Sequence, residues 1–104
     1  FLDVCLRDQC KILQASNGED AYKIAIAERP DLILLDILMP SFDGFATARM
    51  IKNHHATVNI PIIFVTALND PLLRLEATKV GVTDVIVRPF SKSMLVSRIE
   101  KYIN

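Results

Sequence analysis

The sequence contains few glycines and carries no net charge, and each of these features argues against a class of function. The 104 residues include three glycines, and none of them forms the G-x-G-x-x-G turn of a dinucleotide-binding fold. Twelve acidic residues balance 12 basic ones, so the chain has no bulk electrostatic attraction to nucleic acid or to an acidic membrane. We therefore expect no direct binding of nucleic acid.

Long apolar runs and cysteines are few as well. No run approaches the ~20 residues that are needed to cross a bilayer, so we expect no membrane span. The first residues carry an early Asp3 and lack a cationic start, which is unlike a secretory signal. Cys5 and Cys10 match no metal-binding or C-x-x-C spacing and are expected to be reduced, buried thiols. These features predict a cytoplasmic protein.

Aliphatic residues, by contrast, are abundant. Hydrophobic residues make up 51% of the 104 positions, which is enough for a buried interior. A chain of this length is large enough for one core and too small for two, so residues 1–104 are expected to form a single domain. Three short runs, at residues 32–35, 61–65 and 85–87, are apolar without alternation. This pattern is typical of strands covered on both faces. A more polar run at residues 10–15 indicates an edge strand.

Helical patterns separate these strands. Ser16 and Glu19 form a capping box, which opens a helix that Pro30 ends. The inner face of this helix is expected to carry Ala21, Ile24 and Ala25.

The later helices carry clearer end signals. Asp70 followed by Pro71 predicts an N-cap and a proline in the first turn, and Gly81 suits the left-handed position after the last turn. Further helical segments are expected at residues 1–9, at residues 45–53 and after a cap at Ser91. Alternation of strands and helices predicts an α/β fold with a parallel sheet and right-handed crossovers.

Three polar residues, Asp36, Thr66 and Arg88, follow the three apolar strands directly. Ligands of open α/β sheets bind beyond the carboxyl ends of the strands, so these side chains are expected to converge on one patch. An acid, a hydroxyl and a cation suit the transfer of an anionic group to the carboxylate, which would act as the nucleophile. Each residue alone has a plainer explanation, such as a turn-forming aspartate or a solvated arginine.

Four segments, in the expected order, resemble the receiver domain of response regulators. Residues 34–45, LLDILMPSFDGF, look like the phosphoacceptor segment of that family. VTA at residues 65–67 resembles its hydroxyl-bearing strand end, and RPF at residues 88–90 resembles its Lys-Pro-Phe. NGEDA at residues 17–21 fits the start of its second helix.

The resemblance implies a flavodoxin-like, three-layer α/β/α fold with the strand order 2-1-3-4-5. Asp36 would accept a phosphoryl group from a histidine kinase or a phosphotransfer protein, and Mg²⁺ would bind Asp36 and the backbone carbonyl of Leu38. Thr66 would swing to bond the phosphoryl group, and Arg88 would replace the usual lysine. The resemblance further implies a switching surface over residues 71–104. It also implies a cis bond before Pro89.

The main departure from the family concerns the first strand. In the family this strand ends in an acidic pair that supplies further Mg²⁺ ligands, and it is the central strand of the sheet. The sequence begins partway along the helix that follows it. We therefore expect the domain to be incomplete at its N-terminus, with a gap between the strands at residues 10–15 and 32–35 and unpaired backbone groups on both sides of that gap.

Other departures concern the switch and the fate of the phosphoryl group. Arginine brings a planar fork of donors where lysine brings a compact charge, so Arg88 can bind phosphate with altered geometry. Val85 stands where the family often has an aromatic gate. Leu38 and Leu68 stand where the family orients the hydrolytic water, and leucine cannot hydrogen-bond water. We therefore predict slow self-dephosphorylation.

Two other functions can be set beside a phosphorylated switch. A haloacid-dehalogenase-type hydrolase would need a second acid two residues after Asp36, and Leu38 stands there. A degenerate receiver domain could serve as an interaction or dimerisation module without phosphotransfer. Whether it is phosphorylated or degenerate, a receiver domain is a signalling domain rather than an enzyme.

A homodimer could form through the fourth and fifth helices of the family. The candidate exposed apolar residues on these helices are Leu72, Leu75, Met94 and Val96.

Overall fold

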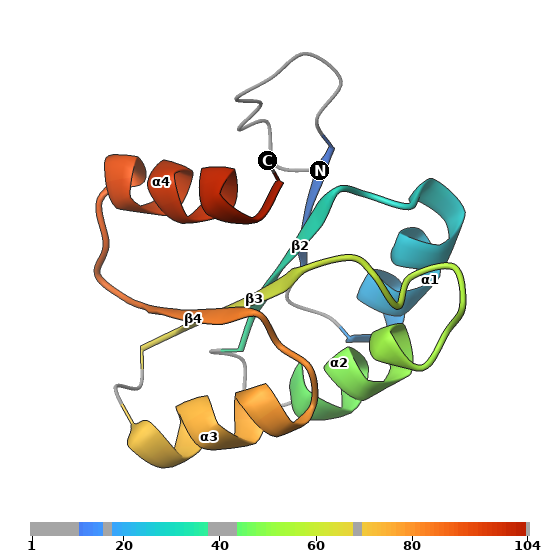
Figure 1. Cartoon of the computed structure of the whole chain (residues 1–104), viewed down its shortest axis with the longest axis horizontal. Helices are drawn as coiled ribbons and strands as arrows, with labels where there is room; N and C mark the ends of the chain where they lie inside the picture. Colours follow the sequence, from blue (N-terminus) through green and yellow to red (C-terminus); the bar gives the residue numbers. More distant parts are fainter. Residues whose placement is uncertain (1–10, 16–17, 38–43, 68–69, 104) are drawn as a thin grey trace.

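The computed structural model describes residues 11–15, 18–37, 44–67 and 70–103. Strands and helices alternate along the chain in the order β1 (Ile12–Ala15), α1 (Gly18–Glu28), β2 (Leu32–Asp36), α2 (Gly44–Lys52), β3 (Ile62–Thr66), α3 (Pro71–Lys79), β4 (Asp84–Val87) and α4 (Lys92–Ile103) (Figure 1). The expected helix at residues 1–9, both cysteines and the Ser16 cap lie outside the described residues.

The strands form one parallel sheet with the order β1-β2-β3-β4. The expected gap beside β1 was wrong for this structure, because β1 pairs directly with β2, from Ile12 opposite Leu32 to Ala15 opposite Leu35. Unpaired backbone N–H and C=O groups inside a sheet cost free energy, and direct pairing satisfies those of the two strands. Within the described residues, the order matches the usual one with its first strand left out.

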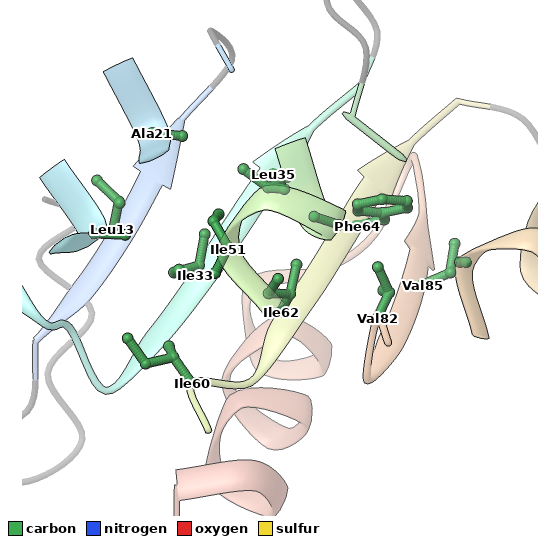
Figure 2. Packing of buried hydrophobic residues seen from close by; sticks show 13 residues of the cluster. Leu13, Ala21, Ile33, Leu35, Ile51, Ile60, Ile62, Phe64, Val82 and Val85 are labelled. Atoms are coloured by element: carbon green, nitrogen blue, oxygen red, sulfur yellow. The ribbon is translucent and has the colours of Figure 1, made fainter. Parts of the chain in front are cut away.

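The sheet has an apolar layer on each face, because side chains alternate along every strand. One face carries Leu13, Ile33, Leu35, Ile62, Phe64 and Val85, which pack with Ala21 and Ala25 of α1, Ala48 and Ile51 of α2, and Ala77 of α3 (Figure 2). The opposite face carries Ile12, Leu32, Leu34, Ile63, Val65 and Ile86, which pack with Ile99 of α4. Helices on both faces give the expected three layers, with α4 on the far side of the sheet from the other three (Figure 1).

Several predicted helix ends are confirmed. The Asp70 side chain accepts a hydrogen bond from the Leu72 backbone N–H at 2.9 Å and caps α3. Gly81 follows that helix with φ of 90°, a left-handed conformation that costs glycine little. Ser91 Oγ accepts from the Met94 backbone N–H at 3.1 Å and caps α4.

One local prediction was wrong. Ile24 is 37% exposed, because the buried stripe of α1 follows the i, i+4 spacing of Ala21 and Ala25. The helix expected at residues 45–53 is confirmed within one residue at each end, since α2 begins at Gly44. A Cβ atom on this glycine would overlap Ile37 Cγ2, so the position requires glycine for close packing.

Candidate functional site

Asp36 and Thr66 end neighbouring strands, and Arg88 follows the next strand directly. Asp36 lies opposite Val65, and Thr66 lies opposite Val87. The backbone continues this alignment, because Arg88 N–H donates to the Thr66 carbonyl at 2.7 Å and Ile37 N–H donates to the Val65 carbonyl at 3.0 Å. The convergence predicted from the sequence is therefore observed at the carboxyl edge of the sheet.

A short contact joins the acid of the site to its cation. Arg88 Nη2 lies 2.7 Å from Asp36 Oδ2 and donates a hydrogen bond to it. Their strands are not neighbours, because β3 lies between β2 and β4. Two strand spacings amount to about 10 Å, which only a long side chain can bridge. Arginine thus has the reach of the lysine that it replaces, and it adds a planar fork that matches carboxylate and phosphoryl oxygens.

Solvent reaches the two ends of this pair to different degrees. The side chain of Arg88 is 39% exposed and that of Asp36 is 20% exposed, so the carboxylate lies in a shallow, accessible position. Thr66 is almost completely buried. Its predicted movement toward a phosphoryl group stays a prediction, because it requires a displacement of the side chain from this position.

Phe90 also belongs to the surroundings of the site. Its ring packs against the apolar layer beneath α4, and the Arg88 guanidinium carbon lies over the ring at 5.7 Å from its centroid. The Arg88–Pro89 peptide bond between them is cis, as the resemblance implied. Arg88 and Phe90 are only two positions apart, but the contact between their side chains depends on the backbone conformation between them.

A Mg²⁺ site is only partly represented in the described residues. Asp36 offers a hard oxygen ligand of the kind that Mg²⁺ prefers. No group of three or more His, Cys, Asp or Glu side chains capable of holding a metal occurs in residues 11–15, 18–37, 44–67 and 70–103. Leu38 and Leu68 lie outside these ranges. The Asp36 carboxylate therefore fits as one ligand of a Mg²⁺ ion, and the described residues do not complete the set of ligands.

Comparison with known proteins decides the family. A family model described as "Response regulator receiver domain" matches residues 2–100. The chain is a response-regulator receiver domain. The flavodoxin-like fold expected from the sequence is thereby confirmed.

Relatives of this receiver domain include two curated transcriptional regulators. The phosphate regulon transcriptional regulatory protein PhoB of Pseudomonas aeruginosa is 39% identical over 88 residues, which cover 85% of this chain and 38% of that protein. The transcriptional regulatory protein SrrA of Staphylococcus aureus is 37% identical over 94 residues, which cover 90% and 38%. The receiver domain thus spans about two fifths of the length of these relatives.

A solved structure shares both the fold and part of the sequence. The receiver domain of a sensor histidine kinase from Pseudomonas aeruginosa PAO1, which has a magnesium ion coordinated in its active-site cleft, superposes with a TM-score of 0.75 at 28% identity. The match covers 86% of this chain and 73% of that chain. In the described part of our receiver domain, no helix is long and apolar enough to span a membrane.

A second polar cluster of the receiver domain lies at the start of β4 and was not foreseen from the sequence. Asp84 Oδ2 accepts hydrogen bonds from Arg98 Nη1 at 2.7 Å and from Tyr102 Oη at 2.9 Å. Burial alone would raise the pKa of Asp84, but the hydrogen bonds from Arg98 and Tyr102 outweigh it and hold this pKa below its usual value. Burial and the hydrogen bond to Asp84 raise the pKa of Tyr102. The i, i+4 spacing of the two donors on α4 is visible in the sequence, but the sequence did not show that Asp84 is their common acceptor.

We expect Asp84→Asn to destabilise the domain by about 1.5–3 kcal/mol at neutral pH, the usual contribution of hydrogen bonds to a charged group. The folded-state pKa lies below the unfolded value, so this stabilisation is present above the unfolded pKa of about 3.9 and is lost as the pH falls through the folded pKa. Urea unfolding between pH 7 and pH 3 should therefore show the two proteins converging at the acid end.

Glu76→Gln provides a matched control for this prediction. Glu76 pairs with Lys79 at 3.4 Å on the exposed surface, where ion pairs contribute about 0–1 kcal/mol. A loss in Asp84→Asn no larger than that in Glu76→Gln would contradict the structural role of the cluster.

Proposed function

We propose that this receiver domain is a phosphorylation switch in which Asp36 accepts a phosphoryl group from a histidine kinase or a phosphotransfer protein. The observation that carries the proposal is the 2.7 Å contact between Arg88 Nη2 and Asp36 Oδ2 across the intervening strand. The contact places a cation beside an accessible carboxylate. The same cation could pair with the oxygens of a phosphoryl group once the carboxylate carries one.

The reaction balances with the residues at this edge. An Asp36 oxygen attacks the phosphorus of a phosphohistidine, and an O–P bond forms as the P–N bond breaks. The electron pair of the broken bond stays with the leaving imidazole, and Asp36 becomes an acyl phosphate. Arg88 would donate to the phosphoryl oxygens, since a guanidinium pairs with phosphate as readily as with carboxylate. Thr66 would donate its hydroxyl to another of these oxygens.

Mg²⁺ is the cofactor that we propose for this transfer. Asp36 and the backbone carbonyl of Leu38 would hold it, with its remaining ligands supplied by other oxygens. When bound, it would neutralise negative charge that builds up between the carboxylate and the phosphoryl group. The magnesium ion of the related Pseudomonas receiver supports this assignment.

Phosphorylation would act on the surface formed by α3, β4 and α4. Arg88 directly follows β4, so a movement of its side chain from Asp36 to a phosphoryl group would be felt in this part of the domain. On that surface Leu72 is 68% exposed, Leu75 52% and Met94 37%, whereas Val96 is half-buried. We propose these three exposed residues as a contact for a second copy or for an output partner.

The domain would be a phosphoacceptor and not an enzyme with turnover on a diffusible substrate. Its phosphoryl group is expected to be long-lived, because leucines stand at the two positions, Leu38 and Leu68, where the family orients water. The lifetime can be followed by removing the phosphodonor and recording the decay of the adduct by intact mass. Decay as fast as in chemotaxis-type receivers would contradict this expectation.

The proposal is tested with the full-length protein that carries this domain. Incubation with Mg²⁺ and acetyl phosphate is expected to add the mass of one phosphoryl group, to fail after chelation of the metal, and to modify a peptide containing Asp36. The adduct should be removed by hydroxylamine, which cleaves acyl phosphates and spares phosphoserine and phosphothreonine. An unmodified protein under these conditions would favour the interaction module that needs no phosphotransfer.

A further inference from the structure

We propose that Phe90 is a positioning residue for the site, and that its ring holds the guanidinium of Arg88 at the place from which it reaches Asp36. This inference rests on the proposed function, because it concerns the cation that would donate hydrogen bonds to the phosphoryl group on Asp36. It differs from a packing role in that it assigns a task to the face of the ring that meets Arg88.

The ring is itself held in place. Phe90 is half-buried and packs against the apolar layer that contains Ile86 and Ile99. A ring fixed in this way can act as a platform, whereas a freely rotating ring cannot. The guanidinium carbon of Arg88 lies over the ring at 5.7 Å from its centroid, within the distance at which the negative face of an aromatic ring attracts a cation.

The position of Arg88 creates a need for such a platform. The side chain is 39% exposed and must cross the width of two strand spacings to reach Asp36. A long exposed side chain has many rotamers, and fixing them opposes the ion pair through lost entropy. The backbone of Arg88 is fixed by the hydrogen bond from its N–H to the Thr66 carbonyl. The ring of Phe90 then restricts the outer half of the side chain, which the backbone cannot do.

The same reasoning links Phe90 to the exchange of lysine for arginine. A planar guanidinium stacks on an aromatic face, whereas a lysine ammonium is compact and strongly hydrated. Arg88 and Phe90 therefore form a matched pair, and Phe90 should matter more to arginine at position 88 than to lysine. This dependence separates positioning from general packing, which would affect both side chains equally.

The test is a double-mutant cycle with four forms of the full-length protein: the parent, Phe90→Leu, Arg88→Lys, and the double variant. Leucine keeps an apolar side chain on the layer beneath α4 but removes the aromatic face. With acetyl phosphate and Mg²⁺, we expect Phe90→Leu to slow adduct formation by about two- to five-fold when residue 88 is arginine. In the Arg88→Lys background the same change should alter the rate by clearly less. Phe90→Tyr, which restores the ring, should restore the parent rate.

A second measurement does not depend on phosphotransfer. Nitrogen-15 relaxation of the Arg88 Nε–H group should show an ordered side chain in the parent and in Phe90→Tyr, and a mobile one in Phe90→Leu. Equal slowing by Phe90→Leu in both backgrounds, or an Arg88 side chain whose order is unchanged in that variant, would overturn the proposal. If the parent itself takes up no phosphate, the proposed function fails, and the relaxation measurement alone decides whether Phe90 positions Arg88.

Discussion

Asp36→Asn is expected to abolish the phosphate adduct completely. The change replaces a carboxylate with a neutral amide, which is not a nucleophile toward phosphorus and cannot form an acyl phosphate. It also removes the charge that pairs with Arg88 at 2.7 Å, while the size and shape of the side chain are kept. Intact mass after incubation with Mg²⁺ and acetyl phosphate measures the result, and peptide mapping shows where any residual phosphate lies.

Asp31→Asn is the matched control for this loss. Asp31 stands just before β2, at the opposite end of the strand from Asp36, and its Oδ2 accepts from the Lys11 backbone N–H at 2.7 Å. An asparagine oxygen can also accept this bond, so the variant should fold and take up phosphate like the parent. An adduct that survives in Asp36→Asn would assign the chemistry to another residue, and loss of the adduct in both variants would show that the change acts through folding.

Phe64→Ala is expected to cause the largest loss of stability among the substitutions considered, about 3–5 kcal/mol. Phe64 is fully buried in the middle of β3 and lies among the side chains that α1, α2 and α3 cover (Figure 2). Its ring meets that of Phe45 edge to face, with centroids 5.3 Å apart, which adds to the free energy of burial. Truncation to alanine would remove both contributions and leave a cavity that the sheet cannot close.

Urea unfolding measures this loss, with Phe64→Leu as a graded variant and Met50→Ala as a control. Leucine fills part of the cavity, so its cost should be smaller than that of alanine. Met50 lies on the outer side of α2 and is 47% exposed, and truncation there should change the stability by no more than about 0.5 kcal/mol. A loss below about 1 kcal/mol in Phe64→Ala would contradict its central place in the core.

The order and type of the elements could be predicted because they depend on local patterns. The apolar runs at residues 32–35, 61–65 and 85–87 correspond to β2, β3 and β4 within one residue at each end. The cap at Asp70 and the left-handed Gly81 were likewise read from single residues with specific backbone preferences. Local signals also gave one error, since the face of α1 that contains Ile24 could not be separated from the buried stripe beside it.

The candidate site could be predicted in outline. Asp36, Thr66 and Arg88 were recognised because carboxyl ends of parallel strands share one edge. The roles of these residues in phosphotransfer, and that of Leu38 in binding metal, stay predictions. The function of Phe90 was not apparent from the sequence, because RPF at residues 88–90 does not reveal where the ring and the guanidinium lie relative to each other.

By itself, the sequence determined that this chain is a parallel α/β domain with an acid, a hydroxyl and a cation at its strand ends, since strand and helix periodicity and strand order along the chain are local properties. Tertiary structure decided which of these groups meet. Arg88 and Asp36 are 52 residues apart, and they pair because β3 separates their strands by a distance that one arginine can span. Tertiary structure also decided the pairing of β1 with β2 and the contact of Asp84 with Arg98 and Tyr102. Packing of strands and helices side by side brings these residues together, and no spacing along the chain specifies which residues meet.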